Sequence, residues 1–360
     1  MIPLFKVYID PSAKRTIPLV FDSGYVGQGP RVEEFEHALT ETLNLPLPLL
    51  TTNSCTSALH LALHLCGAGP STDVISTPIT CTATNSSVVA LGATIVWADV
   101  DPKTGLISPA SVKSRITPRT KAIIAVDWAG QPCNYKELKK VANGIPIIQD
   151  SAHGVGNTGG DYSCYSFQAI KHLTTGDGGA LLCPTKAIYD RVKLLRWYGL
   201  DRTSTDSFRC AQEISEVGYK FHLNDIAATI GLANLPGLKD RLTAHYENAE
   251  IISRVVGGTG GRCSWGSHPN WVLTIHSAHR DELQAFLVAA GITSSPVHAR
   301  NDAMPGFQKH TAPPGQRSAL PGVDSFSRTQ LCIPCGWWLT NDETTWISKT
   351  LMEWYTRYES

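Results

Sequence analysis

Residues 146–179, PIIQDSAHGVGNTGGDYSCYSFQAIKHLTTGDGG, decide the fold and carry the most informative side chains of the chain. The apolar run Pro146–Gln149 reads as a strand and ends in Asp150, while a second strand-like run, residues 162–167, leads to Lys171. A lysine amine held in a pocket can form a Schiff base with an aldehyde cofactor. A carboxylate that keeps a pyridine nitrogen protonated turns such a cofactor into an electron sink. The pair therefore suggests pyridoxal phosphate (PLP) chemistry.

A glycine motif within this stretch offers another interpretation. Residues 154–159, GVGNTG, match the GxGxxG pattern of dinucleotide-binding sites. Such a site needs a helix directly after the glycines, because the amides at the helix N-terminus hold the pyrophosphate. Here the next segment, residues 162–167, is strand-like. The motif therefore indicates a turn rather than an NAD site.

The composition describes a globular chain without a strong charge preference. Of its 360 residues, 42% are hydrophobic and 17% are charged, and 31 acidic side chains balance 31 basic ones. This balance favours neither nucleic acid nor an anionic membrane as a partner. No apolar run is long enough to span a bilayer, and residues 1–6 lack the features of a signal peptide. We expect a cytoplasmic protein with no nucleic-acid or membrane partner.

The ten cysteines do not read as a disulfide scaffold in a chain of this length. Cys332 and Cys335 have the spacing of redox or metal sites. A zinc site would need two more ligands, and the sequence holds no second pair of this kind. We therefore expect two structural thiols in a loop, and no metal site.

Short apolar runs alternate with helix-like segments through the first two thirds of the chain. Nearly continuous apolar strands separated by helices predict a mostly parallel sheet buried on both faces, an α/β fold. Ligands of such sheets bind at the carboxyl ends of the strands, and Asp150, Thr56 and Thr80 fall at such ends or in the loops that follow. The strand-like runs cover 73–78, 92–100, 121–126 and 145–149, and the helix-like segments cover 31–39, 58–66 and 83–91.

A smaller α+β unit is predicted after residue 235. Residues 239–255, 281–290 and 342–358 read as helices, and Trp271–His276 reads as a strand. We therefore divide the chain into a large cofactor-binding domain over residues 1–235 and a small C-terminal domain over residues 236–360.

The polar stretch Thr51–Ser57 reads as a loop before the apolar helix 58–66. The amides of a helix N-terminus and the hydroxyls of Thr56 and Ser57 are suited to a phosphate. Serine and threonine are also favoured as plain helix caps, so this segment taken alone favours a cap. The conjunction is more informative, because a candidate phosphate loop, a strand-end acid, Ser166 and a lysine follow one another in order.

In this order the segments resemble the DegT/DnrJ/EryC1/StrS family of sugar aminotransferases, which are PLP enzymes of fold type I. The similarity covers nearly the whole chain, and each piece is modest alone but specific in combination. It is carried by residues 23–30, 56–60, 92–96, 150–154, 166–171, 175–179 and 217–220.

The resemblance implies a role for each residue at the cofactor ring. Lys171 would form the Schiff base, and Asp150 would hold the pyridine nitrogen. Ala152 would pack under the ring, and His153 would lie near its phenolic oxygen. Cys81 stands where most members carry an aromatic residue that stacks on the ring, so the upper face of the ring would be covered less.

The resemblance also implies how the phosphate is bound. Thr56, Ser57 and Ser166 would contact it, and a loop from the neighbouring subunit of a homodimer would complete the site. In this chain that loop brings Lys220, where many members have asparagine. A lysine still meets a phosphate, as a point charge rather than an amide donor.

The implied reaction moves an amino group from an amino acid, by family analogy glutamate, to a keto sugar. The acceptor would be a nucleotide-linked 3- or 4-keto sugar in amino-sugar biosynthesis. Candidate sugar contacts are Tyr25, Tyr198, His298 and Arg300.

Three alternatives stay open. They are a sugar dehydrase, a cyclitol aminotransferase, and a regulatory protein that keeps the fold but catalyses no reaction. Some relatives that act as dehydrases carry histidine in place of the lysine, so the presence of Lys171 favours transamination.

Overall fold

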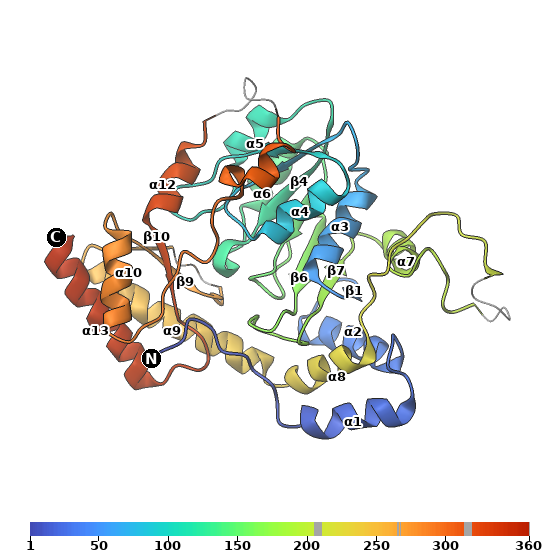
Figure 1. Cartoon of the computed structure of the whole chain (residues 1–360), viewed down its shortest axis with the longest axis horizontal. Helices are drawn as coiled ribbons and strands as arrows, with labels where there is room; N and C mark the ends of the chain where they lie inside the picture. Colours follow the sequence, from blue (N-terminus) through green and yellow to red (C-terminus); the bar gives the residue numbers. More distant parts are fainter. Residues whose placement is uncertain (205–210, 265, 267, 313–318, 360) are drawn as a thin grey trace.

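Two sheets organise the chain (Figure 1), and the computed structural model describes residues 1–204, 211–264, 266, 268–312 and 319–359. The larger sheet has seven strands in the order β1-β7-β6-β5-β4-β2-β3. Its strands run parallel except β7, which is antiparallel to both neighbours. This confirms the predicted mostly parallel α/β sheet. The strands are β1 (Leu49–Thr52), β2 (Asp73–Ser76), β3 (Thr94–Trp97), β4 (Thr120–Val126), β5 (Ile147–Asp150), β6 (Tyr162–Ser166) and β7 (Gly179–Leu182).

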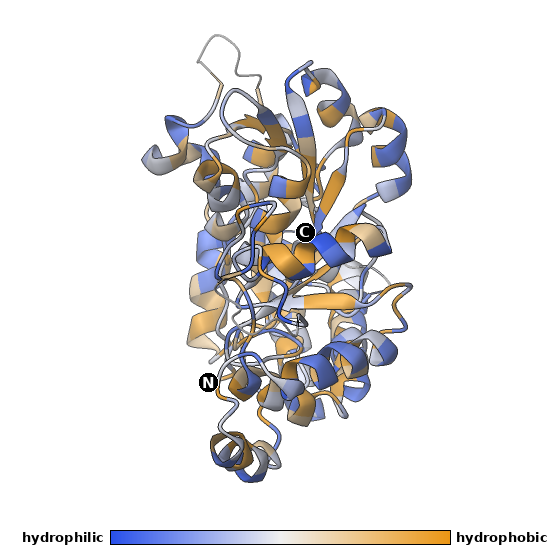
Figure 2. Ribbon diagram, turned by 90° about the vertical axis from the view of Figure 1, so that its right-hand side faces the viewer, coloured by the Kyte–Doolittle hydropathy of each residue, from blue (hydrophilic) through white to orange (hydrophobic). Residues whose placement is uncertain are grey.

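Helices bury both faces of this sheet, as the apolar strands predicted. In β4, Ile124 packs into the core that contains α3, whereas Ile123 and Ala125 pack on the other side with α5 and α6. Figure 2 shows the apolar colour concentrated on the strands and the polar colour on the outer helical surfaces. The helices of this part are α1 (Ala13–Ser23), α2 (Pro30–Thr42), α3 (Cys55–Leu65), α4 (Thr82–Ala90), α5 (Pro109–Arg115), α6 (Tyr135–Ala142), α7 (Lys186–Leu195) and α8 (Asp225–Asn234).

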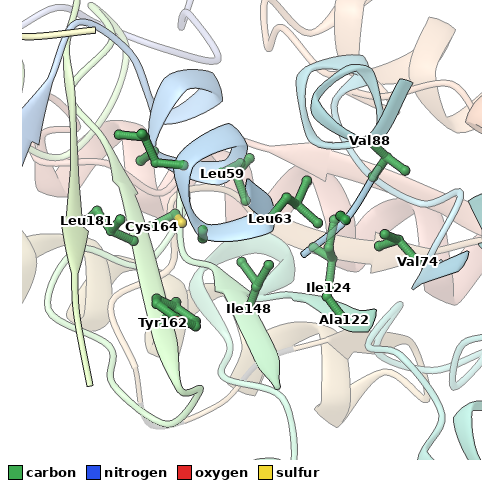
Figure 3. Close-up of a cluster of buried hydrophobic side chains, with 14 of the residues drawn as sticks. Leu59, Leu63, Val74, Val88, Ala122, Ile124, Ile148, Tyr162, Cys164 and Leu181 are labelled. Atoms are coloured by element: carbon green, nitrogen blue, oxygen red, sulfur yellow. The ribbon is translucent and has the colours of Figure 1, made fainter. Parts of the chain in front are cut away.

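Helix α3 is the centre of the main core. Its residues Leu59 and Leu63 are buried and lie above Ile148, Cys164 and Leu181 of three neighbouring strands (Figure 3). A helix that is apolar on nearly all sides is stable only when it is covered on all sides. The burial of α3 therefore fixes the position of its N-terminus over the carboxyl edge of the sheet.

The predicted loop over Thr51–Ser57 was wrong at both ends, since Thr51 and Thr52 close β1 and Cys55–Ser57 open α3. Polar side chains suggested exposure, but Thr51 is fully buried. Its backbone N–H and its hydroxyl both donate to Oε1 of the buried Glu36, at 2.8 and 2.7 Å. The buried Glu36 carboxylate accepts the hydrogen bonds of Thr51, so this polar residue can be buried in the strand.

The smaller sheet belongs to the C-terminal part and has the order β10-β9-β8. Ile2 joins this part through a bridge to Ile292, and both residues lie in its core. Residues 297–312 and helix α12 instead pack back on the large sheet, where Ile95 bridges Thr311. The division at residue 235 stays a prediction. The elements are α9 (Leu238–Gly258), β8 (Arg262–Ser264), β9 (Leu273–His276), α10 (Arg280–Ala289), α11 (Pro305–Gln308), α12 (Pro321–Thr329), β10 (Gln330–Ile333) and α13 (Asn341–Tyr358).

The remaining sequence-based expectations concern cysteines and membranes. Cys332 lies in β10 rather than in a loop, and both it and Cys335 are free, fully buried thiols. Among the described residues, no three His, Cys, Asp or Glu side chains are grouped as they would be around a metal ion. Nor does any described helix combine the length and apolar character needed to cross a membrane.

Asp127, just after β4, explains the glycine motif that resembled a dinucleotide site. Its buried carboxylate accepts hydrogen bonds from five donors, among them Ser151 and Asn157 of the loop after β5. The loop that holds the motif therefore wraps a protein carboxylate, and β6 follows it as predicted. The five donors are the Cys133 N–H (3.0 Å), Tyr135 Oη (2.6 Å), Gln149 Nε2 (2.6 Å), Ser151 Oγ (2.9 Å) and Asn157 Nδ2 (3.1 Å).

We predict that Asp127→Asn lowers the free energy of unfolding by about 2–4 kcal/mol, because an amide N–H₂ would face donors that lose their acceptor in the interior. Urea unfolding followed by tryptophan fluorescence measures the change. Glu137→Gln is the matched control, since it breaks only an exposed pair with Lys140 and should cost under about 0.5 kcal/mol. Equal stability of the two variants would contradict the anchoring role.

Candidate active site

The carboxyl edge of the large sheet holds a cavity of about 360 Å³. Strand β5 ends there with Asp150, β6 ends with Ser166, and the N-terminus of α3 faces them across the cavity. Segments from both parts of the chain line it, because Trp271 and His298 come from the C-terminal part. Of the residues predicted for the site, eight line this cavity: Thr56, Cys81, Asp150, Ala152, His153, Ser166, Lys171 and His298.

Asp150 is a buried acid with few local partners. Its Oδ2 accepts a hydrogen bond from Thr84 Oγ1 at 2.7 Å, and its Oδ1 accepts one from the Ala152 N–H at 3.2 Å. Burial raises the pKa of this carboxyl, whereas the two hydrogen bonds and the nearby Lys171 amine oppose the rise. The carboxylate thus has capacity for another donor on the cavity side, because it can accept about four hydrogen bonds.

Lys171 follows β6 and turns its amine into the same cavity. Burial lowers the pKa of the amine to about 8, and Asp150, Cys55 and Cys81 act in the opposite direction. The amine lies 3.6 Å from the ring centroid of Trp271. A sizeable fraction of this amine is therefore neutral near physiological pH, as a nucleophile or a base requires.

His153 and His298 form an aromatic wall together with Trp271. The ring of His153 stacks on that of Trp271 with centroids 4.1 Å apart, and on that of His298 with centroids 5.6 Å apart. Burial holds the pKa of His153 well below its usual range and lowers the pKa of His298 to about 4. His153 Nδ1 accepts the Ala129 N–H at 3.3 Å, so the proton of the neutral ring lies on Nε2.

The N-terminus of α3 combines the cap and the candidate phosphate site that the sequence left open. Ser54 is the N-cap, and its side chain accepts the Ser57 N–H. Ser57 Oγ donates to Asn53 Oδ1 at 2.6 Å, and Ser57 is not among the residues that line the cavity. Thr56 does line it. The first turn of α3 therefore faces the cavity with Thr56, while Ser57 stabilises the turn.

A glycine lets β7 approach this turn closely. A Cβ atom at Gly179 would lie 2.4–2.7 Å from backbone atoms of Ser54 and Cys55. A side chain at this position would clash, because the backbone atoms that it meets cannot move aside. The close approach keeps the helix N-terminus directly beside the strand ends that carry the acid and the lysine.

Four other predicted residues, Tyr25, Tyr198, Lys220 and Arg300, are not among those that line the cavity. Tyr25 is 60% exposed. The Lys220 amine lies 3.8 Å from the ring centroid of Trp197 and 5.7 Å from that of Tyr198. Arg300 is already paired with two carboxylates: Asp302, at 2.7 Å, and Asp324.

Trp271 is the site residue that sequence reasoning missed. The stretch that contains it was predicted only as a strand of the small domain, and β9 begins two residues later. A strand pattern does not reveal which cavity its first residues reach. Only the packing of the C-terminal part against the large sheet shows that Trp271 reaches the cavity.

The chain as a whole matches a known family. The family model of the DegT/DnrJ/EryC1/StrS aminotransferases matches residues 8–352. The chain belongs to this family. It is therefore an enzyme, a sugar aminotransferase of a family that depends on PLP, and the expected family, enzyme class and cofactor are confirmed.

Individual relatives agree with this assignment. AtS13 from Actinomadura melliaura is 37% identical, with 98% of each chain covered and a TM-score of 0.91. The sugar aminotransferase CalS13 from Micromonospora echinospora is 33% identical, covers 98% of this chain and 100% of its own, and has a TM-score of 0.90. These structures confirm the predicted fold.

A curated relative matches over a shorter stretch. The spore coat polysaccharide biosynthesis protein SpsC of Bacillus subtilis (strain 168) is 34% identical over 233 residues, which is 61% of this chain and 60% of SpsC.

The donor set of the cavity fits PLP. A buried acid, a lysine with a lowered pKa and the N-terminus of α3 are the three features that a pyridine nitrogen, an aldehyde and a phosphate require. When bound, this cofactor supplies an aldehyde and an electron-accepting ring.

We predict that the Lys171 amine of the cofactor-free protein titrates near pH 8. Trace acetylation with acetic anhydride, followed by peptide mass spectrometry, measures the neutral fraction. Labelling should rise about tenfold per pH unit below pH 8 and level off above it, whereas an ordinary lysine continues to rise to about pH 10.4. The exposed Lys14 is the internal reference. Asp150→Asn should move the midpoint lower, because the carboxylate stabilises the ammonium form; a midpoint near 10 would refute the buried-amine assignment.

Proposed function

We propose that this enzyme transfers the amino group of glutamate to a keto sugar, specifically a 3- or 4-keto sugar linked to a nucleoside diphosphate. The observation that carries the proposal is the meeting of Lys171 and Asp150 in one cavity next to the N-terminus of α3. Membership in a sugar aminotransferase family supports the sugar acceptor. The cytoplasmic location expected from the sequence is part of the same proposal.

In this proposal each part of the cavity holds one part of the cofactor. Asp150 would keep the pyridine nitrogen protonated, since its carboxylate is buried, lines the cavity and keeps capacity for a further donor beside Thr84, the Ala152 N–H and the weak thiol donor of Cys55. Ala152 and Cys81 would face the two sides of the ring, and His153 would donate its Nε2 proton to the phenolic oxygen. The phosphate would bind at Thr56 and Ser166, together with Lys220 of the partner subunit. Ser57 has less support, since it does not line the cavity and its hydroxyl donates to Asn53.

Lys171 would have two tasks. Its neutral amine would attach to the aldehyde between turnovers. As a free amine in the cavity, Lys171 would also serve as the base that moves the proton of the donor's α-carbon. A pKa of about 8 suits both tasks, because the best general base titrates near the working pH.

Sugar recognition would occur at the outer part of the cavity. His298 supports this proposal because it lines the cavity. Arg300 has less support, since two carboxylates already neutralise its guanidinium. Tyr25 and Tyr198 are exposed in one subunit, so a role in sugar binding depends on the partner subunit or on closure around the substrate.

The proposed homodimer rests on Lys220. Its amine lies over the ring of Trp197 rather than in the cavity of its own chain, and the nearby Val217 is 74% exposed. Lys220 therefore lies outside the cavity of its own chain, as a residue that serves a neighbouring site would.

We predict that the purified protein with PLP releases at most one 2-oxoglutarate per site from glutamate alone, and releases it over many turnovers only when a suitable keto sugar is present. A panel of nucleotide-linked 3- and 4-keto sugars and a cyclitol ketone identifies the acceptor by formation of the amino sugar. Lys171→Ala should abolish both the visible absorbance of the bound cofactor and turnover. Asp150→Asn should bind the cofactor but turn over about 10²-fold more slowly, as expected for loss of a preorganised charge.

Each other outcome of this panel points to one alternative. Loss of water from the sugar without use of glutamate would indicate a dehydrase, and amination of the cyclitol alone would indicate a cyclitol aminotransferase. A colourless protein after PLP addition would contradict the roles proposed for Lys171 and Asp150 at the cofactor.

We predict that Lys171→Ala and Lys220→Ala complement each other in mixed dimers. If Lys220 serves the neighbouring site, one of the two sites in a mixed dimer has both lysines intact. Unfolding and refolding the two inactive variants together should therefore restore activity, while each refolded alone stays inactive or weak. Failure to restore activity in confirmed mixed dimers would exclude the shared site.

A further inference from the structure

One contact of the cavity has no part in the roles described so far: the amine of Lys171 lies 3.6 Å from the ring centroid of Trp271. This distance is well within the range over which an aromatic face attracts an ammonium group. Trp271 is 3% exposed, so water screens the attraction little.

The position of the Trp271 ring is fixed from several sides. Its indole N–H donates to the carbonyl oxygen of Ile170, the residue before the lysine, at 2.9 Å, and its backbone N–H donates to the Ala129 oxygen at 2.9 Å. Phe5 stacks on the ring with centroids 4.7 Å apart, and His153 stacks on it at 4.1 Å. Trp271 therefore holds both the backbone before Lys171 and the end of its side chain.

An aromatic face differs from a carboxylate as a partner for this amine. It attracts the charged form but carries no basic atom, and the only proton of the indole nitrogen is already donated to Ile170. The amine is thus retained without a salt bridge that would keep it charged.

We infer that Trp271 is a positioning residue that holds the amine of Lys171 in the cavity while the lysine is detached from the cofactor. The inference rests on the proposed function, in which the free amine must wait near the reacting carbon between two proton transfers. Proximity of the amine to the reacting carbon raises the rate only if the Lys171 side chain keeps one rotamer.

Other groups also act on this amine, and the test must separate them from the ring. The carboxylate of Asp150 attracts the ammonium form, and the imidazoles beside the cavity interact with it through charge. Asp177 also lines the cavity. The groups facing the amine are Asp150 from β5, Cys55 from α3, Cys81 before α4, His153 from the loop after β5, His172 next to the lysine, and His298 from the C-terminal part.

The test compares Trp271→Leu with Trp271→Phe in the cofactor-free protein, using the pH dependence of Lys171 acetylation. Leucine removes the face, so the ammonium form loses its partner and the midpoint should fall by about one pH unit, which makes labelling at pH 7 about fivefold faster. Phenylalanine keeps an aromatic face while losing the indole N–H and one of the two fused rings, so its midpoint should fall much less than that of Trp271→Leu. Phe5→Leu is the control for loosened packing, since Phe5 stacks on Trp271 but is not among the residues that line the cavity, and it should leave the midpoint unchanged.

The outcomes are distinct. An unchanged midpoint in Trp271→Leu would overturn the inference, and so would a rise, which would mean that the ring only excludes water. In the loaded enzyme, kcat of Trp271→Leu should fall about tenfold with an unchanged KM for the donor, and Trp271→Phe should recover most of it. Equal kcat losses in both variants would assign the effect to the hydrogen bond with Ile170 and overturn the role of the face.

The titration needs neither cofactor nor substrate. Its result is therefore independent of whether the parent protein proves to be a sugar aminotransferase in the panel assay.

Discussion

The electrostatic balance around a single lysine amine is the constraint on which the rest of the structure depends. Burial disfavours the ammonium form and the Asp150 carboxylate favours it, so the pKa of the amine comes to about 8, while the Trp271 ring packs against the amine at 3.6 Å. Each contributor arrives from a different element: β5, the loop after β6 and the segment before β9. The sheet, α3 and the C-terminal part are thus all needed to set one proton equilibrium.

Two buried acids at neighbouring strand ends illustrate how the same side chain serves different purposes. Asp127 accepts hydrogen bonds from five donors and has no capacity left for a ligand. Asp150 accepts hydrogen bonds from two oxygen and nitrogen donors and faces the cavity. The first carboxylate stabilises the loop after β5, and that loop in turn places Ala152 and His153 beside the second.

Much of the fold and part of the site could be predicted from local patterns. The apolar strands and the order of acid, serine and lysine led to the parallel sheet and to Asp150, Ser166 and Lys171, because these signals lie within short stretches. Strand β1 was missed because the buried Glu36, outside the strand, accepts the hydrogen bonds of Thr51. Trp271 was missed for a related reason, since its partner lies 101 residues away.

The first residues of the chain have a consequence for synthesis. Ile2 bridges Ile292, and Phe5 stacks on the ring of Trp271. At about 5–20 residues per second, these residues emerge from the ribosome roughly 15–60 s before their partners. The segment must therefore remain unpaired through most of translation, and the wall of the cavity closes only as the last part of the nascent chain folds. A ribosome stalled before residue 271 would carry the sheet and the lysine but no competent catalyst.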